Sequence, residues 1–244
     1  MFGIPERFET DLNVKLKDFV PAELKLNDKR HIREAIRSVR MTYQIAGEEI
    51  PSLVTDEHRC HVIQAYDIEV TDVKQANYIA SVYQGLIKPL CIMRFYDNRN
   101  EVYSFADKRL SQTDENQVVV EDTYMTQRYP YGLPGEGIDK YEEFISFDNI
   151  KNRTEKLSLY REWMYKIYMI EHDSAIADLE IILESNTWYS AMKTRNIYLK
   201  YVELVKARES IGRATTNSEK VKINKDIKKA KEALEAEVNM KGDK

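Results

Sequence analysis

The chain has 244 residues, of which 43% are hydrophobic and 10% aromatic, so it is long and apolar enough to bury a sizeable core. Lysine and arginine number 37 against 41 aspartate and glutamate residues, and the resulting net charge of −4 excludes a protein that is basic over its whole surface. No apolar run approaches the roughly 18 to 20 residues that cross a bilayer, and Met1 is not followed by a signal-peptide pattern, so we expect a cytoplasmic protein without membrane contacts.

The first elements in chain order are an arm, a helix and a strand. Apolar residues are loosely spaced over residues 1–20, and we expect this segment to pack over the core as an arm. Residues 28–39 place apolar side chains three and four positions apart after Asn27, a suitable N-cap, which predicts a short helix. Residues 40–46 then alternate between apolar and polar side chains, which is typical of a half-buried strand.

A strand, a helix and another strand follow, in the pattern of a βαβ-like unit. Residues 60–70 are rich in Val, Ile and Tyr, residues 72–87 return to helical spacing, and residues 90–96 are strongly apolar. Residues 101–110 alternate in polarity and predict an antiparallel partner for the last of these strands. A run of valines then begins a further strand over residues 118–124.

The character of the chain changes near residue 129. Residues 129–153 contain the densest proline and glycine cluster and predict a linker with a short helix. Residues 154–240 show helical spacing almost throughout, which predicts a helical hairpin or coiled-coil-like region. The predicted fold class is therefore α+β: a mixed β-sheet domain with flanking helices over residues 1–128, then an all-helical region that ends in a lysine-rich amphipathic helix.

The last predicted helix begins where Thr216 and Glu219 have the spacing of a capping box. Its apolar residues recur at steps of three and four and form one stripe: Ile223, Ile227, Ala230, Leu234 and Val238. Packing of this stripe on a neighbouring helix explains the apolar residues but not the excess of lysine. Contact with a phosphate backbone or an acidic protein surface would account for that excess. The candidate binding residues are Lys220, Lys222, Lys225, Lys228 and Lys229.

A second candidate surface is a positive rim on the predicted sheet. Lys108 and Arg109 close one strand, and Arg94 lies on the preceding strand near aromatic residues. Arginine and aromatic side chains together suit single-stranded nucleic acid, through charge and stacking. The alternative interpretation is a solvated strand edge, where lysine discourages pairing with strands of other molecules.

The patterns for catalysis and metal binding are weak. On a strand, His58 and Cys60 would point to one side and His61 to the other, which does not favour a zinc site. The nearest match to a metal-dependent nuclease consists of Asp67, Glu69 and Lys74. Their spacing does not bring carboxylates together on one ion, as such an enzyme requires. We therefore assign no catalytic residue, no metal ligand and no cofactor.

Several short segments carry a family resemblance. The chain opens with Met-Phe-Gly-Ile-Pro, and residues 220–231 combine a valine and isoleucine pair, an asparagine and a lysine-rich helix. Three further segments lie between the ends in the expected order: 66–69, 87–96 and 108–110. Together they resemble the family catalogued as domain of unknown function 4391. Residues 214–217 depart from the family pattern, in which glutamine, phenylalanine and asparagine are usual.

The resemblance implies a setting, because proteins of this family are commonly encoded beside helicases and DNA methyltransferases in prokaryotic restriction and anti-phage loci. We therefore expect an accessory, non-catalytic subunit of such a defence complex. Its expected partner is a larger helicase or DNA methyltransferase subunit, with DNA as a further contact. Two alternatives stay open: a divergent metal-dependent nuclease of a defence system, and a homodimeric structural protein joined through its C-terminal helices.

Overall fold

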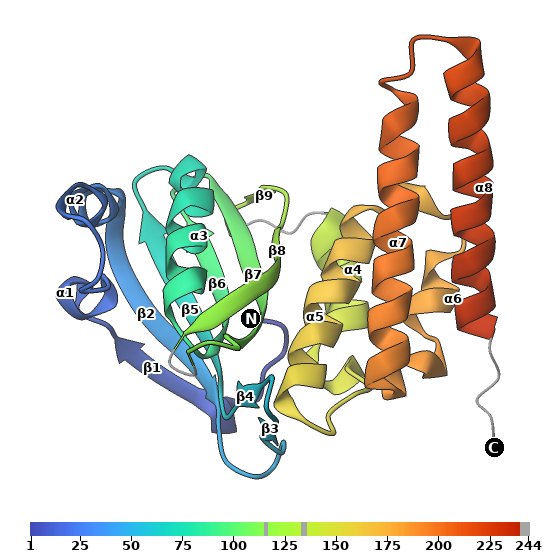
Figure 1. Cartoon of the computed structure of the whole chain (residues 1–244). Helices are drawn as coiled ribbons and strands as arrows, with labels where there is room; N and C mark the ends of the chain where they lie inside the picture. Colours follow the sequence, from blue (N-terminus) through green and yellow to red (C-terminus); the bar gives the residue numbers. More distant parts are fainter. Residues whose placement is uncertain (115–116, 133–135, 240–244) are drawn as a thin grey trace.

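The computed structural model describes residues 1–114, 117–132 and 136–239 and shows a mixed sheet followed by a helical region (Figure 1). Within the described residues, the main sheet has seven strands: β1 (Glu9–Asn13), β2 (Ile36–Ile45), β5 (Ile63–Val70), β6 (Leu90–Tyr96), β7 (Asn100–Leu110), β8 (Val118–Met125) and β9 (Tyr129–Pro130). A small separate ribbon consists of β3 (Leu53–Val54) and β4 (Arg59–Cys60).

The helices fall into two groups along the chain. Those within the sheet region are α1 (Leu16–Phe19), α2 (Leu26–Ala35) and α3 (Ala76–Leu86). Those of the second half are α4 (Glu136–Ile145), α5 (Lys156–Glu171), α6 (Leu179–Leu183), α7 (Ala191–Ile211) and α8 (Asn217–Asn239). Short 3-10 turns cover Glu6–Phe8, Val73–Gln75, Phe147–Asn149, Asp173–Ala175 and Asn186–Tyr189. The α+β fold predicted from the sequence is confirmed.

The sheet has the strand order β1-β2-β5-β6-β7-β8, with β9 beside β7. Strands β5 and β6 run parallel because α3 connects them as a crossover, whereas the other neighbouring pairs are antiparallel. The predicted βαβ-like unit is therefore confirmed, and so is the hairpin that follows it.

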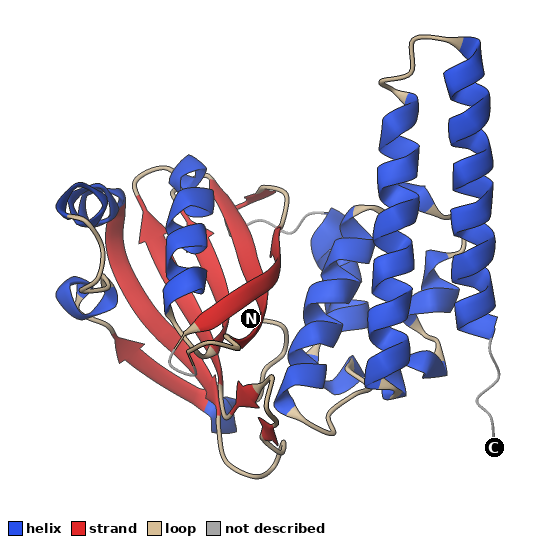
Figure 2. Ribbon diagram, in the orientation of Figure 1, coloured by secondary structure: helices blue, strands red, loops and turns tan. Residues whose placement is uncertain are grey.

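The sheet is covered on both faces (Figure 2). Successive side chains of a strand point to opposite faces, so Ile92 joins the core shared with the second half of the chain, while Met93 joins the core under α1, α2 and α3. Helix α5 lies against the sheet and is buried around most of its circumference, including Trp163. The rings of Phe105 and Tyr160 are 5.8 Å apart across this junction. The sheet and the helical region thus share one hydrophobic core.

Two boundaries in the first half differ from the sequence prediction. The helix predicted over residues 28–39 ends at Ala35, and β2 begins at Ile36. The reason is that Ile36 pairs with Val70 of β5, so a tertiary contact overrides a spacing that also fits a helix. The expected arm does pack over the core through Phe8, but it also supplies β1 as an edge strand.

The segment predicted as a linker begins inside the sheet. Tyr129 pairs with Glu101 and Pro130 with Asn100, because the Tyr129 ring is buried against the shared core. Leu133, Pro134, Gly135 and Met240 lie outside the described residues. The described part of residues 154–240 contains helices and no strand, as predicted. None of the described helices is both long and apolar enough to span a membrane.

Candidate functional site

Helix α8 begins at the capping box that the sequence predicted. The Thr216 N–H donates to Glu219 Oε2 (3.0 Å), and the Glu219 N–H donates to Thr216 Oγ1 (3.2 Å). The backbone bonds from Thr216 and Thr215 lower the pKa of the Glu219 carboxyl. These reciprocal bonds fix the turn after Gly212, and therefore the direction in which α8 returns along α7.

The apolar stripe of α8 packs toward the body of the protein. Leu234 is fully buried, and Ile227, Ala230 and Val238 pack against the same core. Val221, nearer the tip of the hairpin, is 56% exposed. Packing is thus concentrated in the half of the α7–α8 hairpin that lies beside the body, and the other half projects beyond it (Figure 1).

Lysine side chains cover the outer surface of α8. The five candidate lysines are all exposed: Lys220, Lys222, Lys225, Lys228 and Lys229. Lys228 lies 3.8 Å from the Glu232 carboxylate, whereas the other four have no ion-pair partner within the described part of the chain. Lys222, Lys225 and Lys229 are three and four positions apart and share one face, turned away from the apolar stripe. We call these three residues the α8 lysine stripe.

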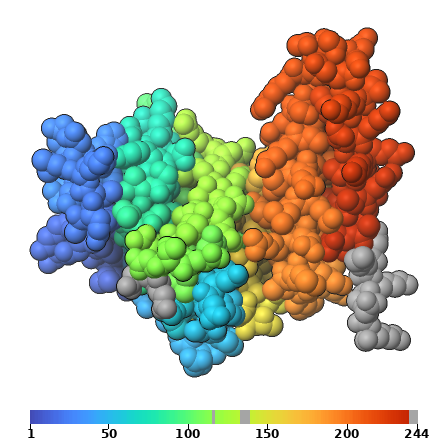
Figure 3. Space-filling model, viewed as in Figure 1, coloured from blue at the N-terminus to red at the C-terminus, as the bar shows by residue number. Residues whose placement is uncertain are grey.

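The positive charge is local to the α7–α8 hairpin around and below its tip. Residues 206–231 hold nine lysine and arginine residues against three acidic residues, Glu209, Glu219 and Asp226, although the whole chain carries −4. The tip stands clear of the rest of the molecule in the space-filling view (Figure 3). A basic surface of this kind attracts an extended anionic surface, either a phosphate backbone or an acidic face of a protein.

The second predicted surface is not assembled as a rim. Arg94 lies on β6 and contacts two carboxylates, Asp67 through Nη1 (3.3 Å) and Glu101 through Nη2 (3.0 Å). Its guanidinium also lies over the rings of Tyr96 and Tyr131, at 5.3 and 5.5 Å. The charge of Arg94 is therefore compensated within the protein, and its side chain links neighbouring strands of the sheet.

Lys108 and Arg109 lie further along β7 and point to different sides. Lys108 is buried, and its ammonium donates to the carbonyls of Ile87 and Pro89 at 3.0 Å each. Burial lowers the pKa of Lys108 to about 8. Arg109 contacts the Glu121 carboxylate at 3.2 Å. Because Lys108 caps the end of α3 inside the protein, the structure does not place it on a binding surface with Arg94.

A buried network that the sequence did not reveal connects β7 with α5. Arg161 donates through Nε to Asp107 Oδ2 (2.8 Å) and through Nη2 to His58 Nε2 (3.4 Å). The hydroxyl of Tyr165 also donates to Asp107 Oδ2 (3.2 Å). Burial, and then the charge of Arg161, lower the pKa of His58 and favour its neutral ring. The only signal in the sequence is an aspartate within an apolar strand, since its partner lies 54 residues away.

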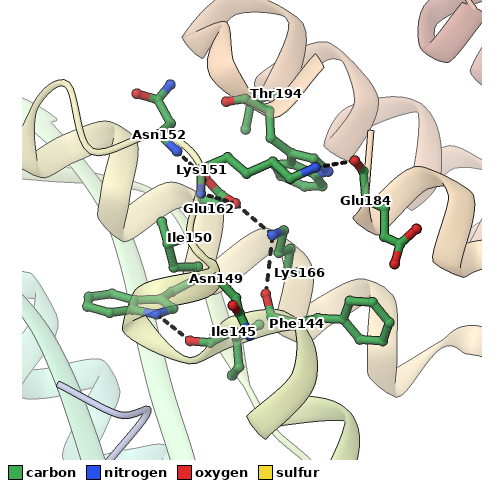
Figure 4. A network of polar contacts seen from close by, with 12 residues as sticks. Phe144, Ile145, Asn149, Ile150, Lys151, Asn152, Glu162, Lys166, Glu184 and Thr194 are labelled. Carbon is green, nitrogen blue, oxygen red and sulfur yellow. Dashed lines mark hydrogen bonds and ion pairs between the residues drawn. The ribbon is translucent and has the colours of Figure 1, made fainter. Parts of the chain in front are cut away.

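A second buried ion pair lies inside the helical region (Figure 4). Glu162 and Lys166 are one helical turn apart on α5, and their charged atoms are separated by 2.7 Å. Glu162 also accepts hydrogen bonds from the backbone N–H groups of Lys151 and Asn152. Lys166 donates to the carbonyl of Phe144 near the end of α4 (3.2 Å). Every charge of this pair therefore has partners in the protein.

A polar cavity of about 600 Å³ opens beside this ion pair, with Lys151 and Lys166 in its wall. The ammonium of Lys151 donates to the carbonyls of Glu184 and Ser185, just after α6. Cations at the C-terminal ends of helices satisfy the last carbonyls and oppose the helix dipole. The two lysines thus hold the ends of α4 and α6 in place, and we assign this network a structural role.

The residues considered for metal chemistry are engaged elsewhere. Asp67 contacts Arg94, Glu69 contacts Arg37 (3.4 Å), and Cys60 is buried with its thiol pKa raised to about 12 by desolvation. Among the described residues, no group of three or more His, Cys, Asp or Glu side chains is placed to hold a metal ion. The zinc and nuclease patterns weighed from the sequence thus do not correspond to a cluster in the described structure.

Comparison with known proteins places the chain in a family without assigning it an activity. No curated protein and no solved structure matches it. The family model described as Domain of unknown function (DUF4391) matches residues 2–234, a span that includes the sheet, α5 and the α7–α8 hairpin as far as Leu234. The chain therefore belongs to the DUF4391 family, as the resemblance of its short segments predicted.

Proposed function

We propose that this protein is a non-catalytic docking subunit of a prokaryotic anti-phage or restriction-type defence complex, acting in the cytoplasm. Its partner in this proposal is a larger helicase or DNA methyltransferase subunit, and the DNA held by that partner is a further contact. We propose this kind of complex because proteins of the family are commonly encoded beside helicases and DNA methyltransferases. The observation that carries the docking role is the α8 lysine stripe, exposed on a projecting hairpin and without ion-pair partners in the described residues.

The geometry of the hairpin supports a binding role for these lysines. Exposed charges contribute little to folding stability, so the stripe has no structural task comparable to that of Lys108 or Lys166. Its base is fixed by Leu234 and its turn by the capping box, so the charged face is presented in one orientation. A preorganised surface loses less conformational freedom on binding.

Affinity purification with the co-expressed partner genes tests this proposal. Tagged wild type should retain the helicase or methyltransferase encoded beside it. The Lys222→Glu, Lys225→Glu, Lys229→Glu triple variant should lose at least 90% of that partner, and retention by wild type should fall as salt is raised. A matched control changes Lys15, Lys17 and Lys25 to Glu, which are exposed near α1 and α2. That control makes the same change in charge and should retain the partner.

The DNA contact is measured separately, by fluorescence anisotropy of labelled duplex with the purified complex over a range of salt concentrations. The slope of log affinity against log salt should fall by about one for each phosphate contact that the triple variant removes. Unchanged partner retention together with an unchanged salt slope would show that the α8 lysine stripe is not a docking surface. A wild-type dimer that becomes monomeric in the triple variant, with no partner retained by wild type, would favour the homodimer instead.

A further inference from the structure

A cleft of about 370 Å³ lies where β8 and α7 meet above α5. Its volume falls within the range of sites that bind small ligands, about 300 to 1,000 Å³. Strand β8 contributes Asp122 and Tyr124, helix α5 contributes Tyr168, and helix α7 contributes Tyr198 and Leu199. No residue of α8 lines this cleft, so it is separate from the α8 lysine stripe.

Tyrosine rings form the wall of the cleft. The rings of Tyr165 and Tyr198 stack with centroids 3.9 Å apart and planes 8° apart. Tyr168 meets Tyr198 edge-on at 5.4 Å, and Tyr124 meets Tyr168 edge-on at 5.1 Å. The faces of such rings carry negative electrostatic potential. A cation that enters the cleft is therefore attracted by the aromatic wall.

Two aspartates stand opposite each other at this wall. Asp107 of β7 and Asp122 of β8 are cross-strand partners, an arrangement that destabilises a sheet unless positive charge lies nearby. Arg161 compensates Asp107 through Oδ2, but Oδ1 has no hydrogen-bond partner in the described residues, and Asp107 is only 2% exposed. Asp122 accepts a hydrogen bond from the Tyr198 hydroxyl (2.6 Å) and has no ion-pair partner among the described residues.

The basic groups near the cleft pair with Asp107 and Glu121, so the carboxylate left without an ion pair among the described residues is that of Asp122. Arg195 contacts Glu121 at 3.4 Å, and Arg161 is committed to Asp107 and Glu121. Lys206 lines the rim but is exposed, so water and salt screen its charge. The carboxylate in the cleft wall that remains to pair with an incoming cation is therefore that of Asp122.

We infer that this cleft binds a guanidinium group of the kind that an arginine side chain carries. A guanidinium is planar, so it can stack on the tyrosine wall, and it offers a fork of N–H donors to carboxylate oxygens. Asp122 supplies the accessible carboxylate, and Asp107 Oδ1, which has no hydrogen-bond partner in the described residues, is a further acceptor in the wall. The ligand is thus recognised by charge and shape together.

Isothermal titration calorimetry with N-acetylarginine methylamide tests the inference on the full chain. Wild type should give saturable binding, and the neutral citrulline analogue of the same shape should bind at least tenfold more weakly. Asp122→Asn keeps an acceptor for the Tyr198 hydroxyl but removes the charge, so it should weaken binding at least tenfold. Tyr168→Leu removes one aromatic wall and should weaken binding at least fivefold.

Asp28→Asn is the matched control, because Asp28 also accepts a tyrosine hydroxyl, that of Tyr78 at 2.8 Å, but lies on α2 under the other face of the sheet. It should bind the arginine probe like wild type, and so should the triple variant of the α8 lysine stripe. Circular dichroism verifies that each variant is folded. Three results would each overturn the inference: no saturable binding by wild type, equal affinity for the citrulline analogue, or unchanged affinity in both folded cleft variants.

Discussion

The ammonium of Lys108 lies under the end of α3, where it donates to the carbonyls of Ile87 and Pro89. Burial lowers its pKa to about 8, below the ordinary lysine value of 10.5. Between these values the unfolded chain keeps a proton that the folded chain has released, so the free energy of unfolding rises with pH. Below about pH 8 Lys108 is protonated in both the folded and the unfolded chain, so it does not change the free energy of unfolding as the pH varies.

We therefore expect the wild type to gain stability between about pH 8 and pH 10, and Lys108→Met to lack this contribution. Urea unfolding monitored at several pH values measures the slope. Lys15→Met, at an exposed position, should follow the wild-type slope. The test stops near pH 10 because tyrosines of the unfolded chain ionise there. If Lys108→Met shows the same slope as the other two proteins, Lys108 does not titrate in this range.

Adjacent charges in a sequence do not predict a common surface. Lys108 and Arg109 are neighbours on a strand, so their side chains must point to opposite faces. That much follows from the sequence. The burial of Lys108 does not, because it depends on α3 ending above this point of β7. The ion pair of Asp107 and Arg161 could not be predicted either, because the sequence around each residue does not identify its partner.

Three tyrosine hydroxyls from separate elements converge on Glu171 at the end of α5. Tyr124 of β8, Tyr129 of β9 (2.5 Å) and Tyr141 of α4 (2.7 Å) all donate to this carboxylate, and the Gln127 N–H adds a further bond (3.0 Å). Desolvation, and then the charge or hydrogen bond of Glu171, raises the pKa of these tyrosines. One carboxylate thus joins the edge of the sheet to two helices.

Glu171→Gln should lower the free energy of unfolding by about 2 to 4 kcal/mol, because charge-assisted hydrogen bonds are exchanged for weaker ones. For a chain of this size the melting temperature should fall by about 5 to 15 °C. Differential scanning calorimetry and urea unfolding measure the two quantities. Glu180→Gln, an exposed position on α6, should change the melting temperature by less than about 2 °C. Equal effects of the two substitutions would contradict this assignment of Glu171.

At the scale of elements, the sequence predicts best where one local signal is sufficient. The capping box needs only the side chains of Thr216 and Glu219, three positions apart in the sequence, and the structure reproduces it. The boundary between α2 and β2 needs the position of β5, because Ile36 fits either a helical stripe or a strand. Tyr129 likewise joins the sheet through distant partners.

At the scale of the whole molecule, stability is concentrated along α5 and declines toward the hairpin tip. Trp163, Met164 and Ile167 of α5 are fully buried, whereas residues 206–226 contain no buried side chain. Backbone hydrogen bonds that are covered by few apolar contacts open more easily. The projecting tip of the hairpin should therefore be the first part of the helical region to open.

Native-state hydrogen exchange measured by mass spectrometry tests this gradient. Amides of α5 should exchange only on global unfolding, and those of residues 206–226 should exchange faster by at least tenfold. Leu234→Ala removes the main buried contact of α8 and should cost about 2 to 5 kcal/mol of local stability. It should extend fast exchange along α8, whereas Val221→Ala at an exposed position should not. Uniform protection of α5 and the tip would contradict the gradient.

The organisation into a sheet region and a helical region follows from periodicity, because strands and helices repeat with different spacings. The shared core does not follow from it. Ile92 and Phe105 could cover a helix from the same chain or from a partner, and only the fold shows that α5 fills that space. The same holds for the cleft between β8 and α7, whose tyrosines and aspartates come from four separate elements.

The shared core also sets an order of events during synthesis. Residues 19–102 contain every buried member of the core under α1, α2 and α3, so that side of the sheet can close early. The opposite side waits for α5, and the rings of Phe2 and Phe105 can meet Trp163 and Tyr160 only after some 60 further residues have been translated. At about 5 to 20 residues per second that delay is about 3 to 12 s. A nascent chain paused in this interval presents one finished and one bare apolar face to the ribosome and its chaperones.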